Sequence, residues 1–237
     1  MEFVVIGDLH YFRPSGDIRE KMRAFRQDME RKRIRPEWIC SLGDVIENQR
    51  GPSPVSGAEG VRQWTAALKD IGQVFPEVPF LIVPGNHDWY GNNTWFGGRP
   101  NLDRFWAPFM EKQLGSSLNG KLFASFRHGD VLCLLVNHVG MDAGQDAEQR
   151  KWLRKTLAAA DANPAVRHVF AFGHCGLWNV NYFRFNENAE LLPVFAESKK
   201  LRGYFAGHVH RNSLTVYRVP EKNPVLQAIV SGLFADG

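Results

Sequence analysis

One pattern constrains this chain more than any other: five apolar segments each end in Gly or Pro-Gly, and Asp, Asn or His follows at once. The segments are residues 3–6, 38–42, 80–83, 166–172 and 203–206. Short apolar runs bounded by glycine are typical of buried strands. In an open α/β sheet, ligands bind beyond the carboxyl ends of the strands, so loops that are distant in the sequence can converge there. The pattern therefore predicts an α/β fold in which five strand-end loops build one site.

The five loops carry residue types that bind metal ions. They contain Asp8, His10, Asp44, Asn86, His87, Asp88, His174, His208 and His210. Without His87 and Asp88 the set still holds two Asp, one Asn and four His, more donors than one tetrahedral site uses. Oxygen and imidazole donors suit Mn, Fe, Zn and related divalent ions. The set therefore predicts two ions, with Asp44, alone in its loop, as the candidate to bridge them.

Other segments have the periodicity of amphipathic helices or further strands. Helices are expected at residues 17–34, after a capping box formed by Ser56 and Glu59, after the cap residue Asp146, and at about residues 188–197. Further strands are expected as a hairpin at 122–126 and 131–136, and at 214–219 and 225–230. Residues 89–110 are rich in aromatic residues, glycine and proline, which indicates an irregular excursion.

Composition and charge predict a soluble, globular, cytoplasmic protein. The chain has 237 residues, of which 44% are apolar and 23% charged, and one large domain accounts for that length. We find no apolar run of membrane-spanning length, and no charged leader precedes the first strand. The net charge of +4 is concentrated in residues 19–35, where it is typical of a solvated helix face. It gives little reason to expect nucleic acid as a partner.

The cysteines are expected to play no part in the chemistry. Cys40, Cys133 and Cys175 are odd in number and widely spaced, and they lie mostly in apolar runs. This arrangement favours reduced thiols in the core over a disulfide framework or a cysteine-based zinc site.

Taken together, the five loops resemble the sequence blocks of the calcineurin-like metallophosphoesterases. The blocks are Asp8-x-His10, Gly43-Asp44, Gly85-Asn86-His87-Asp88, Gly173-His174 and Gly207-His208-x-His210, in the family's order. Each block alone is common, but five in order, each after an apolar strand, form a specific signal. The resemblance implies a four-layer α/β (α+β) fold, two mixed β-sheets packed face to face and flanked by helices. It also implies one domain over residues 1–237, with an aromatic-rich insertion at about 89–110.

The resemblance further implies a role for each residue of the blocks. One ion would be bound by Asp8, His10, Asp44 and His210, and the other by Asp44, Asn86, His174 and His208. His87 would face the substrate phosphate and protonate the leaving oxygen, and Asp88 would orient its ring. Ions about 3.5–4 Å apart can share a hydroxide and neutralise phosphoryl charge during in-line displacement. Mn or Fe are the first expectation, with Zn, Ni, Co and Mg as alternatives.

Two departures from related patterns bear on the subfamily. Purple acid phosphatases carry an iron-binding Tyr three residues after the Asp of the second block, and they lack the His of the first. This chain has Glu47 and His10 at those positions, which argues against an Fe(III)-tyrosinate site. In the fourth block His174 is followed by Cys175-Gly176, where relatives often have His or Pro.

The expected function is hydrolysis of a small, nucleotide-like phosphodiester. His10 and the aromatic residues Trp89, Tyr90 and Trp95, on which a base could stack, favour a diester. A phosphomonoesterase or protein phosphatase, and a non-catalytic metal-binding scaffold on the same fold, remain the alternatives. A complete set of blocks, with His87 present, favours an enzyme over a scaffold. Three histidines lie outside the blocks, His128, His138 and His168, and for a lone histidine a structural role is the default.

Overall fold

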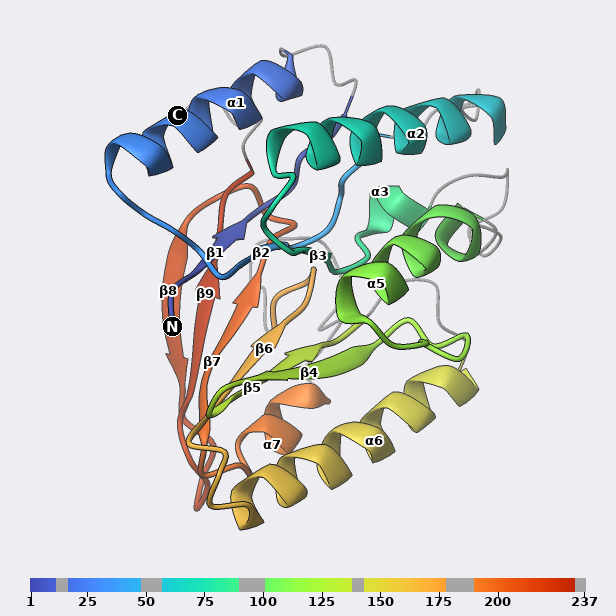
Figure 1. Cartoon of the computed structure of the whole chain (residues 1–237). Coiled ribbons are helices and arrows are strands. Elements are labelled where there is room, and N and C mark those ends of the chain that lie inside the picture. The colour runs from blue at the N-terminus through green and yellow to red at the C-terminus, as the bar shows by residue number, and fades with distance from the viewer. Residues whose placement is uncertain (12–16, 48–56, 90–100, 138–142, 178–189, 233–237) are drawn as a thin grey trace.

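Two β-sheets form the centre of the molecule in the computed structural model, which describes residues 1–11, 17–47, 57–89, 101–137, 143–177 and 190–232 (Figure 1). The smaller sheet has the order β1-β2-β3 and comprises β1 (Phe3–Ile6), β2 (Trp38–Ser41) and β3 (Phe80–Ile82). Within the described residues its strands are all parallel. Each of its strands is joined to the next by a connection that contains a helix, as parallel pairing requires.

The larger sheet is mixed and has the order β4-β5-β6-β7-β9-β8. Its strands are β4 (Ala124–His128), β5 (Val131–Leu135), β6 (His168–Phe172), β7 (Leu201–Ala206), β8 (Ser213–Tyr217) and β9 (Val225–Ile229). The β4–β5 and β8–β9 pairs are antiparallel, whereas β5, β6, β7 and β9 run parallel. The predicted hairpin is therefore confirmed as β4–β5.

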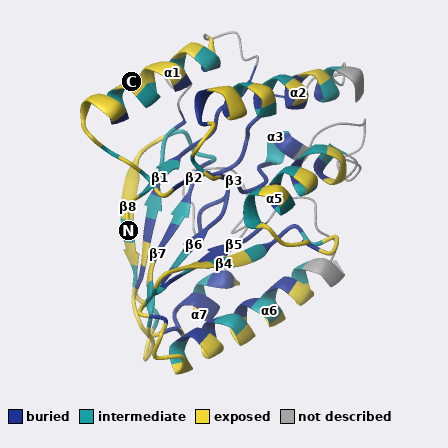
Figure 2. Ribbon diagram, viewed as in Figure 1, coloured by how far each residue is buried: buried dark blue, intermediate teal, exposed yellow. Residues whose placement is uncertain are grey.

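Helices cover the outer faces of both sheets. In Figure 1, α1 (Ile18–Arg31) and α2 (Gly57–Val74) lie on the side of the smaller sheet, and α6 (Ala143–Ala162) and α7 (Leu191–Phe195) lie beneath the larger one. Figure 2 shows exposed residues along the outer faces of α1 and α6. Among the described helices, none is long and apolar enough to cross a membrane. The expected α/β fold of two sheets flanked by helices is confirmed, but within the described residues only the larger sheet is mixed. The described strands of the smaller sheet are all parallel, because each connection between them contains a helix.

Aromatic side chains hold the two sheets together. The ring of Phe3 on β1 stacks on Trp38 of β2 at a centroid distance of 4.5 Å. Both rings meet the edge of Phe172 on β6, at 5.9 Å and 5.4 Å. Phe172 in turn stacks on Phe205 of β7 at 5.3 Å. Such offset and edge contacts add stability beyond the area that they bury, so the packing fixes how the strand ends of the two sheets face each other.

Helix limits differ from the sequence-based expectation by a few residues. The helix α1 begins after the N-cap Asp17, whose side chain accepts the backbone N–H of Arg19 at 2.9 Å, but it ends at Arg31 instead of Ile34. The helix α6 begins at Ala143, before the expected cap Asp146. The helix α7 is shorter than expected, and Ser56, the expected cap of α2, lies outside the described residues.

The second half of the aromatic segment is helical, not irregular. A π-helical turn η1 (Leu102–Trp106) continues there into α5 (Ala107–Leu114), and a short helix α3 (Asn86–Trp89) lies at the beginning of the whole segment. The buried residues Leu102, Trp106 and Met110 recur every four positions, which is a helical stripe that the aromatic composition obscured. Trp106 Nε1 donates a hydrogen bond to the carbonyl oxygen of Ile82 at 2.9 Å and so attaches this segment to β3. Residues 90–100 lie outside the described part of the chain.

Candidate metal centre

The five glycine-ended loops meet where β1, β2, β3, β6 and β7 end. The backbone N–H groups of Leu9 and His10 donate to the carbonyl oxygen of Asp44, at 3.0 Å and 2.8 Å, which joins the first loop to the second. The backbone N–H of His208 donates to Asp8 Oδ2 at 3.0 Å, which joins the fifth loop to the first. The convergence predicted from the sequence is therefore present.

A first cluster of buried donors gathers Asp8, His10, Asp44 and His210, whose ligand atoms all lie within 4.8 Å of one another. The Nε2 atoms of His10 and His210 are 3.2 Å apart. His10 Nε2 is 3.7 Å from Asp44 Oδ2, and His210 Nε2 is 3.6 Å from Asp8 Oδ1. This is the residue group that the family resemblance implies for one ion.

A second cluster lies on the other side of Asp44. His174 Nε2 is 2.9 Å from Asn86 Oδ1, 3.2 Å from His208 Nδ1 and 3.3 Å from Asp44 Oδ2. The backbone N–H of His87 donates a hydrogen bond to Asp44 Oδ1 at 2.8 Å. The other oxygen, Oδ2, is the one that faces both clusters.

The donor set fits a pair of divalent ions. Donor atoms held about 2.1 Å from a first-row ion lie roughly 3.0–3.4 Å apart in tetrahedral or octahedral geometry. The separations of 2.9–3.7 Å in the two clusters are close to that spacing. Asp8, His10, Asp44 and His174 are also fully or almost fully buried, and buried carboxylates and imidazoles need a countercharge or a metal. The buried clusters are therefore consistent with a dinuclear metal site.

Backbone strain is concentrated at the candidate ligands. His10, Asp44, His208 and His210 have φ angles of 47°, 50°, 70° and 53°, in the left-handed region that residues other than glycine and asparagine seldom adopt. Each such residue costs about 1–3 kcal/mol and persists only where its surroundings fix it. The strain turns the side chains of successive loop residues toward one point.

The strand-end glycines are required because the ligands approach the backbone too closely for a side chain. A Cβ atom on Gly85 would lie 2.2 Å from Asp44 Oδ1, and one on Gly207 would lie 2.6 Å from Asp8 Oδ2. Any larger residue at either position would displace a carboxylate of the site. At Gly85 and Gly207, glycine in the sequence pattern is therefore required by the close approach of a carboxylate of the site.

Opposite charges inside the centre stabilise each other strongly. Burial alone would raise the pKa of Asp44, but the imidazoles of His174, His87 and His10 hold it well below its usual range. Burial alone would lower the pKa of His174, but the carboxylates of Asp44 and Asp8 raise it to about 10. The site therefore favours positive charge between its carboxylates, whether as a proton or as a metal ion.

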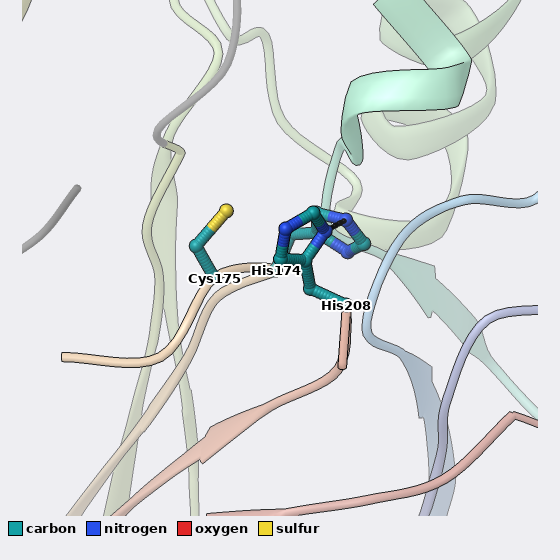
Figure 3. A group of neighbouring side chains, drawn as sticks. All are labelled: His174, Cys175 and His208. Atoms are coloured by element: carbon teal, nitrogen blue, oxygen red, sulfur yellow. Dashed lines mark hydrogen bonds between the residues drawn. The ribbon is translucent and has the colours of Figure 1, made fainter. Parts of the chain in front are cut away.

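Cys175 lies beside the second cluster. Its sulfur and one ring nitrogen each of His174 and His208 lie within 4.8 Å of one another. Figure 3 shows His174 and His208 next to each other with Cys175 to one side, and the two rings meet edge to face at a centroid distance of 4.9 Å. All three cysteines are free and buried, as expected. No feature of the sequence indicated that one thiol lies this close to two candidate ligands, and that sulfur takes no part in the chemistry stays a prediction.

His87 lies next to residues of the metal centre. Its Nδ1 contacts the carbonyl oxygen of Glu47, and its Nε2 is 4.0 Å from Asp44 Oδ2. The His87 ring packs edge to face on His10 at 4.6 Å. With 21% of its side chain exposed, His87 is reachable from solvent while it borders both clusters.

Asp88 has different partners from those expected. Its Oδ1 accepts the backbone N–H groups of Val45 and Ile46 at 2.8 Å and 3.2 Å, and its Oδ2 accepts that of Gly85 at 2.8 Å. Burial, together with the nearby Asp44 carboxylate, raises the pKa of Asp88 to about 7. Asp88 therefore joins the second and third loops, and the partner of the His87 ring is the Glu47 carbonyl.

Glu47 is a residue of the site whose contact sequence reasoning missed. Its Oε2 lies 2.8 Å from Nδ1 of His10. The one available signal was its position three residues after Asp44, where it served only to exclude a Tyr ligand.

The histidines and aromatic residues outside the blocks add little to the site. His128 pairs with Glu37, and His168 accepts a hydrogen bond from Arg202 at 3.1 Å, so both have structural roles as expected. Tyr11 is buried, and its hydroxyl faces Met22 of α1, away from the site. The remaining residues considered for substrate contact lie outside the described side chains: Trp89, Tyr90, Trp95 and His138.

Comparisons with known proteins agree with this arrangement. A family model described as calcineurin-like phosphoesterase matches residues 1–212. The serine/threonine-protein phosphatase CPPED1 of Danio rerio is 27% identical over 201 residues, which are 79% of this chain and 58% of that protein. The acid sphingomyelinase-like phosphodiesterase 3b of Homo sapiens is 26% identical over 202 residues, which are 75% of this chain and 44% of that protein. The chain thus spans about half the length of these curated relatives.

Among solved structures, a dimetal phosphatase from Danio rerio is similar over 98% of this chain and 87% of that chain. The TM-score is 0.68 at 16% sequence identity. At this identity the likeness shows a shared fold.

Proposed function

Because the chain belongs to the calcineurin-like phosphoesterase family, we propose that its metal-dependent hydrolase activity is directed at a small, nucleotide-like phosphodiester. The metal-dependent phosphoesterase class follows from family membership and the buried His/Asp clusters. The diester preference and the size of the substrate are the proposal.

The metal-dependent chemistry of the proposal rests on the position of one oxygen of Asp44. Its Oδ2 lies 3.7 Å from Nε2 of His10 in the first cluster and 3.3 Å from Nε2 of His174 in the second. A carboxylate oxygen between two sets of donors is what a shared ligand of two ions requires. Ions bound there would supply Lewis-acid neutralisation of phosphoryl charge and activate a water nucleophile at neutral pH.

His87 is suited to proton transfer next to that centre. The Glu47 carbonyl oxygen can only accept a hydrogen bond, so Nδ1 of His87 is the protonated nitrogen. Nε2, on the side of Asp44, is then the nitrogen that can gain and release a proton. A positioned acid is worth about 10²–10⁴ in rate when the leaving group is a poor one. The alkoxide that leaves an alkyl phosphodiester is such a group.

The relatives support both a diester and a monoester substrate. One relative has the name of a phosphodiesterase and another that of a serine/threonine-protein phosphatase. The first supports our proposal. The second makes a phosphomonoesterase the alternative that an experiment must separate from it.

A comparison of aryl phosphates tests the proposal. Protein stripped with chelator and refilled with Mn²⁺ is assayed on bis(p-nitrophenyl) phosphate and on p-nitrophenyl phosphate. We expect a higher kcat/KM on the diester, and no turnover on either substrate by Asp44→Asn, which lacks the shared carboxylate. A large preference for the monoester would replace our proposal by the alternative. Bound metal without turnover of either ester would favour a scaffold.

A panel of cyclic nucleotides, dinucleotides, phospholipids and phosphopeptides then identifies the substrate class. We expect turnover within the nucleotide group. Turnover confined to phosphopeptides or phospholipids would contradict the nucleotide-like assignment.

A further inference from the structure

Two histidines of the centre, His10 and His174, are held in different ways at the ring nitrogen that points away from the candidate ions. Nδ1 of His174 contacts the carbonyl oxygen of Leu42 at 2.7 Å, and a carboxylate oxygen, Asp8 Oδ1, lies 3.9 Å from it. Nδ1 of His10 has a carboxylate in close contact, with Oε2 of Glu47 at 2.8 Å. Both imidazoles are fully buried. The carboxylate behind His10 is therefore much closer to the ring than the one behind His174.

Burial of the Glu47 carboxylate has a desolvation cost that a partner must offset. Glu47 is 7% exposed, and a buried carboxylate is retained only where a charged or hydrogen-bonding partner offsets its desolvation. The contact with His10 is a close charge contact rather than a well-directed hydrogen bond.

The same residue also contacts the candidate acid. The backbone carbonyl oxygen of Glu47 contacts Nδ1 of His87. The carboxylate of Glu47 thus contacts the candidate ligand His10, and its backbone carbonyl contacts the candidate acid His87. His10, Glu47 and His87 each have a ligand atom within 4.8 Å of the others, with Nδ1 of His87 on this carbonyl and Nε2 of His10 directed at the first cluster.

We propose that Glu47 is a positioning residue for the first metal ion, and that its carboxylate fixes the His10 ring with Nδ1 protonated and Nε2 directed at that ion. A carboxylate behind a ligating imidazole raises its basicity as a donor, and its loss typically weakens metal affinity 10–100-fold. Glu47 thereby strengthens the binding of the ion held by Asp8, His10, Asp44 and His210. This inference rests on the proposed function only in requiring that two ions bind.

Metal titration of Glu47 variants tests the inference without an activity assay. Chelator-stripped wild-type protein, Glu47→Ala, Glu47→Gln and the control Glu197→Ala are titrated with Mn²⁺ by calorimetry. Electron paramagnetic resonance separates a coupled ion pair from a single ion. Glu197 forms a surface ion pair with Lys222 at 2.9 Å beyond the end of α7, so its loss should leave both ions unchanged.

We expect Glu47→Ala to bind one of the two ions about 10–100-fold more weakly and the other as the wild type does. At one equivalent of Mn²⁺ its spectrum should be that of an isolated ion. Glu47→Gln keeps an acceptor for Nδ1–H but not the charge, so it should recover part of the loss. If Glu47 served only folding, Glu47→Ala would not lose Mn²⁺ affinity at one site alone, and Glu47→Gln would not recover part of that affinity.

The outcomes separate this inference from the proposed function. Two ions bound with wild-type affinity in both Glu47 variants would overturn the inference and leave the function untouched. No ion bound by the wild type would overturn the proposed function itself. If Glu47→Ala fails to fold, the isosteric Glu47→Gln decides, and unchanged affinity for both ions in that variant overturns the inference.

Discussion

His87 differs from the other block histidines in what surrounds its ring nitrogens. Nε2 of His10, His174 and His210 lies 2.9–3.7 Å from other candidate ligand atoms, whereas Nε2 of His87 is 4.0 Å from the nearest carboxylate oxygen recorded for it, on Asp44. The distance suits a group that meets a bound phosphate more than one that binds an ion. Chemistry and metal binding should therefore separate at this residue.

We expect His87→Ala to keep both ions and to lose about 10²–10⁴ in kcat on an alkyl phosphodiester, because the leaving group then departs without a proton. Metal content by mass spectrometry and steady-state kinetics measure the two effects. On an aryl ester, whose leaving group needs no proton, the loss should be smaller. Loss of an ion in His87→Ala would place His87 among the ligands instead.

The metal-free protein should lose stability as the pH rises from about 6.5 to 10. The folded state raises the pKa of His174 from 6.5 to about 10, so its contribution to stability is complete below pH 6.5 and lost as the pH approaches 10. The loss is at most about 1.4 kcal/mol per pH unit, or roughly 2–4 °C in Tm. Thermal melts in chelator at pH 6.5, 7.5 and 8.5 measure it. With Mn²⁺ bound the fall should disappear, and a Tm that rises with pH in chelator would contradict the assignment.

Residue identities were more predictable than residue contacts. The positions of Asp8 and Asp44 directly after apolar strands were enough to place them together, because the parallel strands of one sheet end at one edge. His174 follows a strand of the other sheet, so its approach to them depends on how the two sheets pack. The pairing of Glu47 with His10 involves loops in which His10 and Asp44 have left-handed backbone, and no local sequence pattern predicts that conformation. For the same reason Asp88, adjacent to His87 in sequence, bonds to the backbone of the preceding block instead.

At the scale of elements, the strands were predicted closely and the helix ends less well. A strand that is buried on both faces is visible as an apolar run, whereas a helix end is set by a cap that several nearby residues can supply. The segment 101–114 was missed for another reason. Its helical stripe lies inside an aromatic and glycine-rich composition, and its attachment to β3 through Trp106 is a tertiary contact.

The strand-end glycines offer the sharpest test at this scale. We expect Gly85→Ala to fold but to lose metal affinity by at least tenfold, because the new methyl group would overlap Asp44 Oδ1. Gly72→Ala in α2 is the matched control, since nothing lies within 4 Å of its new methyl group. That control should bind metal normally and gain roughly 0.5–1 kcal/mol in stability. Equal metal affinity in both variants would show that the close approach at Gly85 is not required.

At the scale of the whole molecule, the centre connects the two sheets. Asp8, His10, Asp44 and Asn86 follow strands of the smaller sheet, and His174, His208 and His210 follow strands of the larger one. The aromatic packing of Phe3 and Trp38 against Phe172 sets the distance between the two groups. The family resemblance implied the layers but not this distance, which depends on side chains that pack across the sheets.

The central claim is that these loops build one dinuclear centre with Asp44 shared between the ions. Anomalous diffraction at the manganese edge, from crystals of the Mn²⁺-loaded protein, tests it most directly. We predict two peaks about 3.5–4 Å apart on either side of Asp44 Oδ2, one beside His10 and His210 and the other beside His174 and His208. A single peak, or two peaks that do not share Asp44, would contradict the account.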